Sequence, residues 1–364
     1  MIKSLAEKTK NFYDAHERGL GIGFMLFGFG LDSLTLKRSD LFFDNLVIIW
    51  YLLLALAGII AINMNNSGRF KKPFFQKISY WAPLPLQMAF GGLFSAFTVL
   101  YSRSAAFLAS WPFILILFLL MVGNEFFKSR YAKFAFHLTI YYAALLSYSI
   151  LLVPVITRKM GALMFFISGL ASLLAITLIL LMLKKLAPER LAKSKNYIFV
   201  SVVSVYAVFN ILYFTNIIPP VPLSLRAIGI YHNLERTNGG YNALVERPAW
   251  YKFYNDTSRT FNRYENERVY VFSSVFAPTD LESQIFHRWS KYDEASKKWV
   301  IQSQLSYSMI GGRDGGFRGF SYKQNIQPGR WRVDVVTSRG QLIGRINFMI
   351  EETTNKPELK NVKL

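Results

Sequence analysis

The chain has no cysteine among its 364 residues, only four histidines and only 18% charged residues. Without cysteine, disulfides, thiolate nucleophiles, cysteine zinc sites and iron–sulfur clusters are excluded. Four scattered histidines also argue against a histidine-rich metal site, so we expect no metal and no cofactor. The hydrophobic fraction of 52% is concentrated before residue 219, which excludes a wholly soluble enzyme.

Seven apolar windows precede residue 219, and each approaches the ~20 residues that a spanning helix needs. They cover residues 20–36, 41–62, 80–101, 105–124, 135–156, 162–183 and 197–218. The first is short and glycine-rich, but it lacks the small-x-small cleavage site of a signal peptide. The sequence therefore predicts an all-α membrane domain of about seven transmembrane helices over residues 1–218.

Lysine and arginine are distributed unevenly over the connections between these windows. Sixteen of them fall in the N-terminal tail and the even-numbered connections, and five fall in the odd-numbered ones. Basic residues mark the cytoplasmic side. We therefore expect a cytoplasmic N-terminus, an extracytoplasmic C-terminal half and a multi-pass protein whose partner is the lipid bilayer. The net charge of +20 suits anionic lipid, and no nucleic-acid-binding motif accompanies it.

Four ionisable residues near the ends of the predicted spans form a possible intramembrane polar site. Asp32 and Asp44 lie at the expected outer ends, and Glu125 and His137 at the expected inner ends. Polar residues within a membrane are candidates for ion or proton paths. They can equally pair with neighbouring basic residues in the interfacial layer, because none lies at the middle of a span.

The pattern changes after a proline-rich spacer at residues 219–224, which we expect to be stiff and extended. About eight short strands with period-two alternation follow over residues 225–351, and a polar tail is expected over 352–364. Asn238-Gly239-Gly240 predicts a hairpin between two of the strands. This pattern is typical of an all-β, immunoglobulin-like sandwich. Its core is expected around Trp289, Trp299 and Trp331, with His287 on the same face as Trp289.

The glycine-rich stretch at residues 310–320 has two interpretations. It can be a simple hairpin turned at Asp314-Gly315. It can also be a recognition loop, in which Arg313, Asp314 and Arg318 meet carboxylates or phosphates and Phe317 and Phe320 supply stacking surface. It lacks the Gly-Lys-Ser/Thr of a phosphate loop. The ligand-binding residues predicted from it are Arg313, Asp314, Phe317, Arg318 and Phe320.

Several C-terminal motifs resemble a bacterial envelope family known only as domain of unknown function 2914. They are Ile285-Phe-His-Arg-Trp289, the glycine-rich stretch, Gly329-Arg-Trp-Arg-Val-Asp-Val335 and Gly340-Gln-Leu-Ile-Gly-Arg-Ile346, with Gly229-Ile-Tyr-His-Asn233 also similar. The resemblance covers about 225–351, and it implies an extracytoplasmic β domain and a bacterial origin. No activity is established for that family, so it implies no catalytic residue.

Three functional hypotheses follow. The first is a bacterial inner-membrane protein whose periplasmic β domain binds an envelope component, either a cell-wall or other anionic glycan or an envelope protein, without catalysis. Thirteen arginines against eight lysines after residue 218 favour planar recognition of carboxylate or phosphate. The second is a transporter or signal-transducing membrane region with an accessory outer domain. The third is a membrane-embedded enzyme acting on a lipid-linked substrate, for which Asp32 and Asp44 are the only outer carboxylates.

Overall fold

The computed structural model describes most of the chain and divides it into two compact units. The described residues are 26–68, 74, 79, 82–104, 106–126, 134–237, 240–246, 259–278, 282–310 and 316–364. The first unit is helical and contains most of residues 1–218. The second contains residues 219–364 together with two short stretches, Ser104–Ala109 and Thr157–Gly161.

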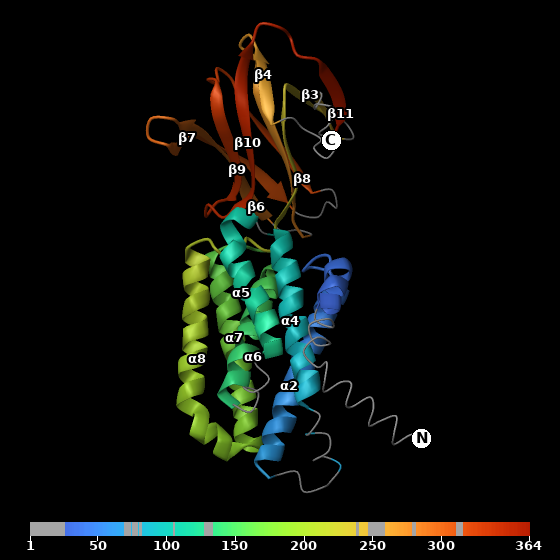
Figure 1. Cartoon of the computed structure of the whole chain (residues 1–364), viewed down its shortest axis with the longest axis vertical. Coiled ribbons are helices and arrows are strands. Elements are labelled where there is room, and N and C mark those ends of the chain that lie inside the picture. Colours follow the sequence, from blue (N-terminus) through green and yellow to red (C-terminus); the bar gives the residue numbers. More distant parts are fainter. Residues whose placement is uncertain are drawn as a thin grey trace, which may run out of the picture. The chain divides into compact units, whose positions relative to one another are not determined.

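The helical unit contains long apolar helices that run side by side (Figure 1). They are α2 (Phe42–Asn66), α4 (Pro83–Ser104), α5 (Phe107–Phe126), α6 (Phe134–Thr157), α7 (Ala162–Leu186) and α8 (Pro188–Phe214), and residues 26–35 are also helical. Within the described part of the chain, five of these helices are long and apolar enough to cross a membrane, namely α2, α4, α6, α7 and α8. In α5, the shorter segment Ala109–Gly123 is apolar.

The helices coincide with six of the seven predicted windows, and residues 26–35 lie within the first. The largest difference is at α8, which begins at Pro188 rather than near residue 197. Proline is favoured in the first turn of a helix because its missing N–H would be unpaired there anyway. The basic residues Arg190, Lys193 and Lys195, expected in a connection, therefore lie on the first turns of α8.

The β unit consists of three sheets. The strands are β1 (Ser224–Tyr231), β2 (Asn233–Thr237), β3 (Gly240–Glu246), β4 (Thr260–Tyr264), β5 (Val269–Phe276), β6 (Glu282–Asp293), β7 (Lys298–Ile310), β8 (Phe317–Lys323), β9 (Gly329–Thr337), β10 (Leu342–Thr353) and β11 (Leu359–Lys363). Their orders are β1-β5-β8, β4-β10-β9-β6-β7 and β11-β3-β2.

The five-stranded sheet and the β1-β5-β8 sheet bury the main core. Trp289 of β6, Trp331 and Val333 of β9 and Val271 of β5 are almost fully buried in one cluster. A second cluster contains Tyr231, Leu234, Ala243, Val245 and Phe272 and joins β1 and β5 to the β11-β3-β2 sheet. The β1-β5-β8 sheet is therefore covered on both faces, because Val271 and Phe272 point in opposite directions along one strand.

Two expectations about the β unit need correction. Trp299 is only half-buried and lies outside the core clusters, because its ring is on the outer face of the sheet, where the guanidinium of Arg332 lies over it. Residues 352–364, expected as a polar tail, contain the end of β10 and the whole of β11, which pairs with β3. The turn expected at Asp314-Gly315 lies outside the described residues; the described strands on either side of it pair elsewhere, β7 with β6 and β8 with β5.

The hairpin predicted at Asn238-Gly239-Gly240 is confirmed by the antiparallel register of β2 and β3, in which Thr237 faces Gly240. The sheets are not wholly antiparallel, however. β4 pairs in parallel with β10, with Phe261 opposite Ile350. Together with the third sheet, this pair extends the architecture beyond a simple two-sheet antiparallel sandwich.

Candidate functional site

Arginines gather on the outer face of the five-stranded sheet. Successive side chains of a strand point to opposite faces, and in β9 the residues Trp331 and Val333 enter the core. Arg332 and Asp334 therefore point outward. The register places Arg345 of β10 and Arg288 of β6 opposite Asp334, one on each side.

The carboxylate of Asp334 contacts two of these arginines. Arg345 donates two hydrogen bonds to Asp334, with Nε 2.5 Å from Oδ1 and Nη2 3.0 Å from Oδ2. The Nε atom of Arg332 lies 3.5 Å from Oδ2 of the same carboxylate. The Asp334 side chain is 5% exposed, so its charge is held within the sheet surface.

Two residues of β7 complete this surface. Arg288 donates from Nε to Oε1 of Gln304 at 3.2 Å. The guanidinium of Arg332 lies 4.7 Å from the ring centroid of Trp299, in cation–π geometry. We call the set Arg288, Trp299, Gln304, Arg332, Asp334 and Arg345 the arginine face.

The electrostatics of the arginine face favour an anion. Burial lowers the pKa of Arg332; Asp334 opposes this effect, and the neighbouring Arg345 and Arg288 add to it. Three guanidinium groups and one carboxylate leave an excess of two positive charges. Like charges on neighbouring strands are unfavourable, so a bound carboxylate or phosphate would relieve the repulsion and accept bidentate hydrogen bonds.

A second arginine–aromatic pair borders the arginine face. Arg330 lies 4.0 Å from the ring centroid of Tyr292, and its Nη2 atom is 2.9 Å from a carboxylate oxygen of Glu294. The rings of Tyr292 and Trp299 meet edge to face at 5.3 Å. These aromatic contacts restrict the guanidinium groups of Arg330 and Arg332 and so lower the entropy lost on binding.

Of the predicted recognition-loop residues, the structure describes Phe317, Arg318 and Phe320, and alternation along β8 places Phe317 on the opposite face from the other two. Phe317 packs against the core between the β1-β5-β8 sheet and the five-stranded sheet, whereas Phe320 packs against the cluster beside the β11-β3-β2 sheet. Arg318 donates from Nη1 to the backbone oxygen of Leu364 at 2.9 Å. Arg313 and Asp314 lie outside the described residues.

Two of the possible intramembrane residues, Asp32 and Asp44, accept hydrogen bonds in the structure. Asp32 accepts a hydrogen bond from Ser95 of α4, with the two oxygens 2.5 Å apart. The carboxylate of Asp44 accepts the backbone N–H groups of Lys37 and Arg38 at 2.8 and 2.9 Å, which ties down the connection before α2. His137 is buried in α6. The Glu125 side chain lies outside the described residues.

His287 is fully buried, as expected for a residue on the Trp289 face. Its Nε2 atom lies 2.7 Å from Ser273 Oγ, and its Nδ1 atom lies 2.8 Å from Ser321 Oγ. Ser321 also accepts a hydrogen bond from Trp289 Nε1 at 2.9 Å. Burial lowers the pKa of His287 to about 4. A neutral imidazole without access to solvent makes this network a polar tie between two sheets rather than a catalytic centre.

His232 forms a second tie, which we call the His232 clasp. Its Nε2 atom lies 2.9 Å from Glu246 of β3, and its Nδ1 atom lies 3.0 Å from Glu267. Its ring stacks on Phe261 of β4 at 4.0 Å. Asn262 donates from its backbone N–H to Glu246 at 2.6 Å. The clasp therefore connects all three sheets.

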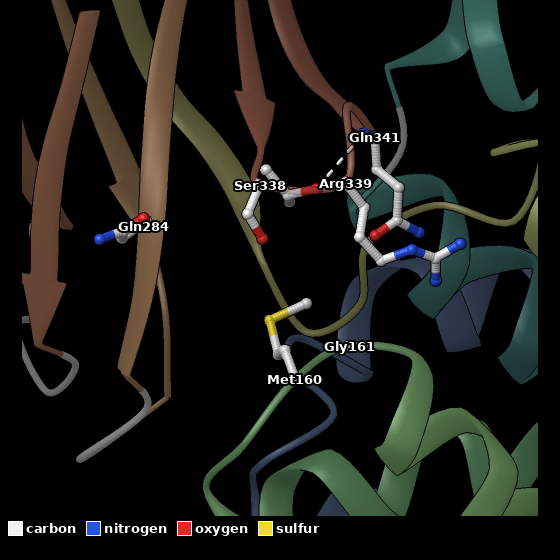
Figure 2. A pocket seen from close by; sticks show the side chains of 7 residues that line it. Met160, Gly161, Gln284, Ser338, Arg339 and Gln341 are labelled. Carbon is white, nitrogen blue, oxygen red and sulfur yellow. Dashed lines mark hydrogen bonds between the residues drawn. The ribbon is translucent and has the colours of Figure 1, made fainter.

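A small polar pocket lies at the turn between β9 and β10 (Figure 2). Its volume is about 210 Å³, and it is lined by Met160, Gly161, Gln284, Thr337, Ser338, Arg339 and Gln341. Figure 2 shows Ser338 and Met160 pointing toward one another, while the Arg339 guanidinium points away from Gln284. Small-molecule sites usually exceed ~300 Å³, so the arginine face is the stronger candidate. In the described ranges, no three His, Asp or Glu side chains are grouped to hold a metal.

One family model matches part of the β unit. Residues 282–350 match the family described as "Protein of unknown function (DUF2914)", which confirms the resemblance for β6 to β10. This segment contains every residue of the arginine face. No curated protein matches the chain.

Among solved structures, the Pseudomonas fluorescens alkylpurine DNA glycosylase AlkC, bound to DNA containing an abasic site analogue, aligns over 86% of this chain and 100% of its own. The identity is 9% and the TM-score is 0.22, so this alignment carries no argument about fold or function.

Proposed function

We propose that the protein is a membrane-anchored binding protein whose β unit captures an anionic envelope component, either a glycan or a protein, without catalysis. The observation that carries the proposal is the arginine face, where Arg345 and Arg332 contact the Asp334 carboxylate and Arg288 adds a third guanidinium group beside them. Uncompensated guanidinium pairs of this kind are typical of sites for carboxylate or phosphate.

The proposal includes a topology. Seven spans with a cytoplasmic N-terminus would place the β unit outside the cytoplasm of a bacterial inner membrane. The bias of sixteen basic residues to five supports this orientation, and the five long apolar helices are consistent with it. The immunoglobulin-like topology of the β unit stays a prediction.

The test is binding of the full-length protein, in detergent, to an anionic polymer such as polygalacturonate at low and high salt. We expect Arg288→Gln with Arg332→Gln to weaken binding at least tenfold, because each hydrogen bond to a charged group contributes about 1.5–3 kcal/mol. Salt should weaken the wild-type interaction.

The matched control is Arg236→Gln with Lys360→Gln, which removes two positive charges from exposed positions in the third sheet. An equal loss of affinity in this control would show that binding depends only on overall positive charge, and it would contradict the proposal. Thermal unfolding of each variant checks that the β unit remains folded.

The alternative of a transporter or signal-transducing membrane region is favoured by the hydrogen bond between Asp32 and Ser95, which joins two segments of the helical unit. In that case Asp32→Asn should abolish the transport or signalling activity in cells while leaving polygalacturonate binding unchanged. On the binding proposal, Asp32→Asn has no effect on either measurement.

A further inference from the structure

β7 is an open sheet edge. Among the described strands it pairs only with β6, over the range Glu282–Asp293 against Lys298–Ile310. It is thirteen residues long and contains no proline and no acidic residue. Edge strands are normally protected against pairing with other chains by lysine, proline or a bulge. β7 begins at Lys298 and has one bulge between Ile301 and Ser303, so these features are confined to its first half. The regular edge after the bulge is suited to accept another strand.

Apolar side chains on β7 are also exposed. Ile301 is 58% exposed, Val300 is 43% exposed and Leu305 is 39% exposed. An additional strand would lie ~4.8 Å beyond β7. Its apolar side chains would then contact Val300 and Leu305, which the register places on the core face of the sheet, so hydrophobic burial would accompany the new backbone hydrogen bonds.

Two guanidinium groups of the arginine face contact side chains of β7. Arg288 belongs to β6, yet its guanidinium reaches Gln304 of β7. Arg332 belongs to β9, and its guanidinium lies over Trp299 of β7. An acidic side chain on the outer face of an added strand would therefore approach both groups.

Charge complementarity also indicates which kind of strand would pair with the β7 edge. Pairing of β7 with β7 of a second copy would bring two sets of arginines together, which is unfavourable. A polypeptide strand with acidic residues at every second position would instead place one carboxylate face against the arginine face and one apolar face against Val300 and Leu305.

We infer that the partner is an extended segment of another protein, with acidic and apolar residues alternating, that adds as a sixth strand to β7. The inference rests on the proposed function and names the class of ligand for the same site. Backbone hydrogen bonds would supply affinity, and the alternation of side chains would supply specificity.

The experiment uses the full-length protein and three synthetic peptides. The first alternates Glu with Val over eleven residues. The second has the same composition with its Glu residues contiguous, and the third is the first peptide with its backbone nitrogens methylated. We expect the first to bind at least tenfold more tightly than the other two, and hydrogen exchange of the β7 amides to slow on binding.

The variants separate this inference from the proposed function. Arg288→Gln with Arg332→Gln should weaken binding of the alternating Glu-Val peptide, whereas Arg236→Gln with Lys360→Gln should leave that binding unchanged. Equal binding of the methylated peptide, or unchanged exchange in β7, overturns strand addition. If polygalacturonate binds and no peptide does, the ligand is a glycan: the inference fails and the proposed function stands. If neither binds, both fail.

Discussion

At the scale of single residues, the most informative group is the His232 clasp. Burial alone would lower the pKa of His232, but its hydrogen bonds to Glu246 and Glu267 raise it above the usual value. Burial would likewise raise the pKa of Glu246, but hydrogen bonds from His232 and Asn262 lower it. The folded state therefore favours a charged histidine beside the charged carboxylate of Glu246.

The clasp predicts a stability that depends on pH. The contribution of His232 is complete below its ordinary pKa of about 6.5 and is lost as the pH rises through the higher pKa of the folded state. That of Glu246 is present above about 4.5 and is lost as the pH falls. We expect His232→Gln to cost about 2 kcal/mol at pH 6 and to abolish the decline in stability above pH 6.5.

Thermal unfolding of the wild type and His232→Gln between pH 6.5 and 8 measures this effect. The window avoids His287, whose pKa of about 4 makes stability rise with pH between about 4 and 6.5. A wild-type stability that stays constant from pH 6.5 to 8 would show that the clasp is not charged.

At the scale of elements, glycine makes room for an aromatic contact between β7 and β8. A Cβ atom at Gly319 would lie 2.5 Å from the ring of Tyr307, whose hydroxyl group is 2.7 Å from Ser273 Oγ. Gly319→Ala should therefore displace Tyr307 and cost about 1–3 kcal/mol. Denaturant unfolding measures the cost, and in a Tyr307→Ala background the same substitution should be nearly neutral. An unchanged cost in that background would place the strain elsewhere.

Period-two alternation and β-branched or aromatic composition were sufficient to predict the strands from β5 to β10, because most of them bury one apolar face and β5 is apolar on both. The sequence pattern missed most of β1 (Ser224–Tyr231), because the first predicted strand began only at residue 230. It also missed β4 (Thr260–Tyr264) and β11 (Leu359–Lys363), which are five residues long and largely polar. It also could not assign partners, since pairing such as β4 with β10 joins residues distant in sequence. The helical windows were easier to find because a span carries its signal within one segment.

The arginine face was missed for the same reason. Arg288, Arg332 and Arg345 lie on three strands, and only the register places them around Asp334. One local signal was present: in β9, Arg330, Arg332 and Asp334 alternate with Trp331, Val333 and Val335. The site was predicted in the glycine-rich stretch instead because the composition of that stretch is unusual. Composition alone does not place side chains on one surface.

At the scale of the whole molecule, the absence of cysteine permits a direct test of topology. We expect Ser306→Cys, at an exposed position of β7, to react with a membrane-impermeant maleimide in intact cells. Lys195→Cys, on the expected cytoplasmic side, should react only after the membrane is permeabilised. Labelling of Lys195→Cys in intact cells, with Ser306→Cys protected, would invert the proposed orientation.

The pairing of the last strands has a consequence for biosynthesis. β3 near residue 243 needs β11 near residue 361, and β4 near residue 262 needs β10 near residue 351. Such distant contacts slow folding because a long loop must close before either pair forms. The emerging β unit therefore cannot complete two of its three sheets until almost all of residues 219–364 has left the ribosome. On the proposed topology, that segment would cross the membrane as an open chain, with its aromatic core exposed to chaperones and proteases until the last twenty residues arrive.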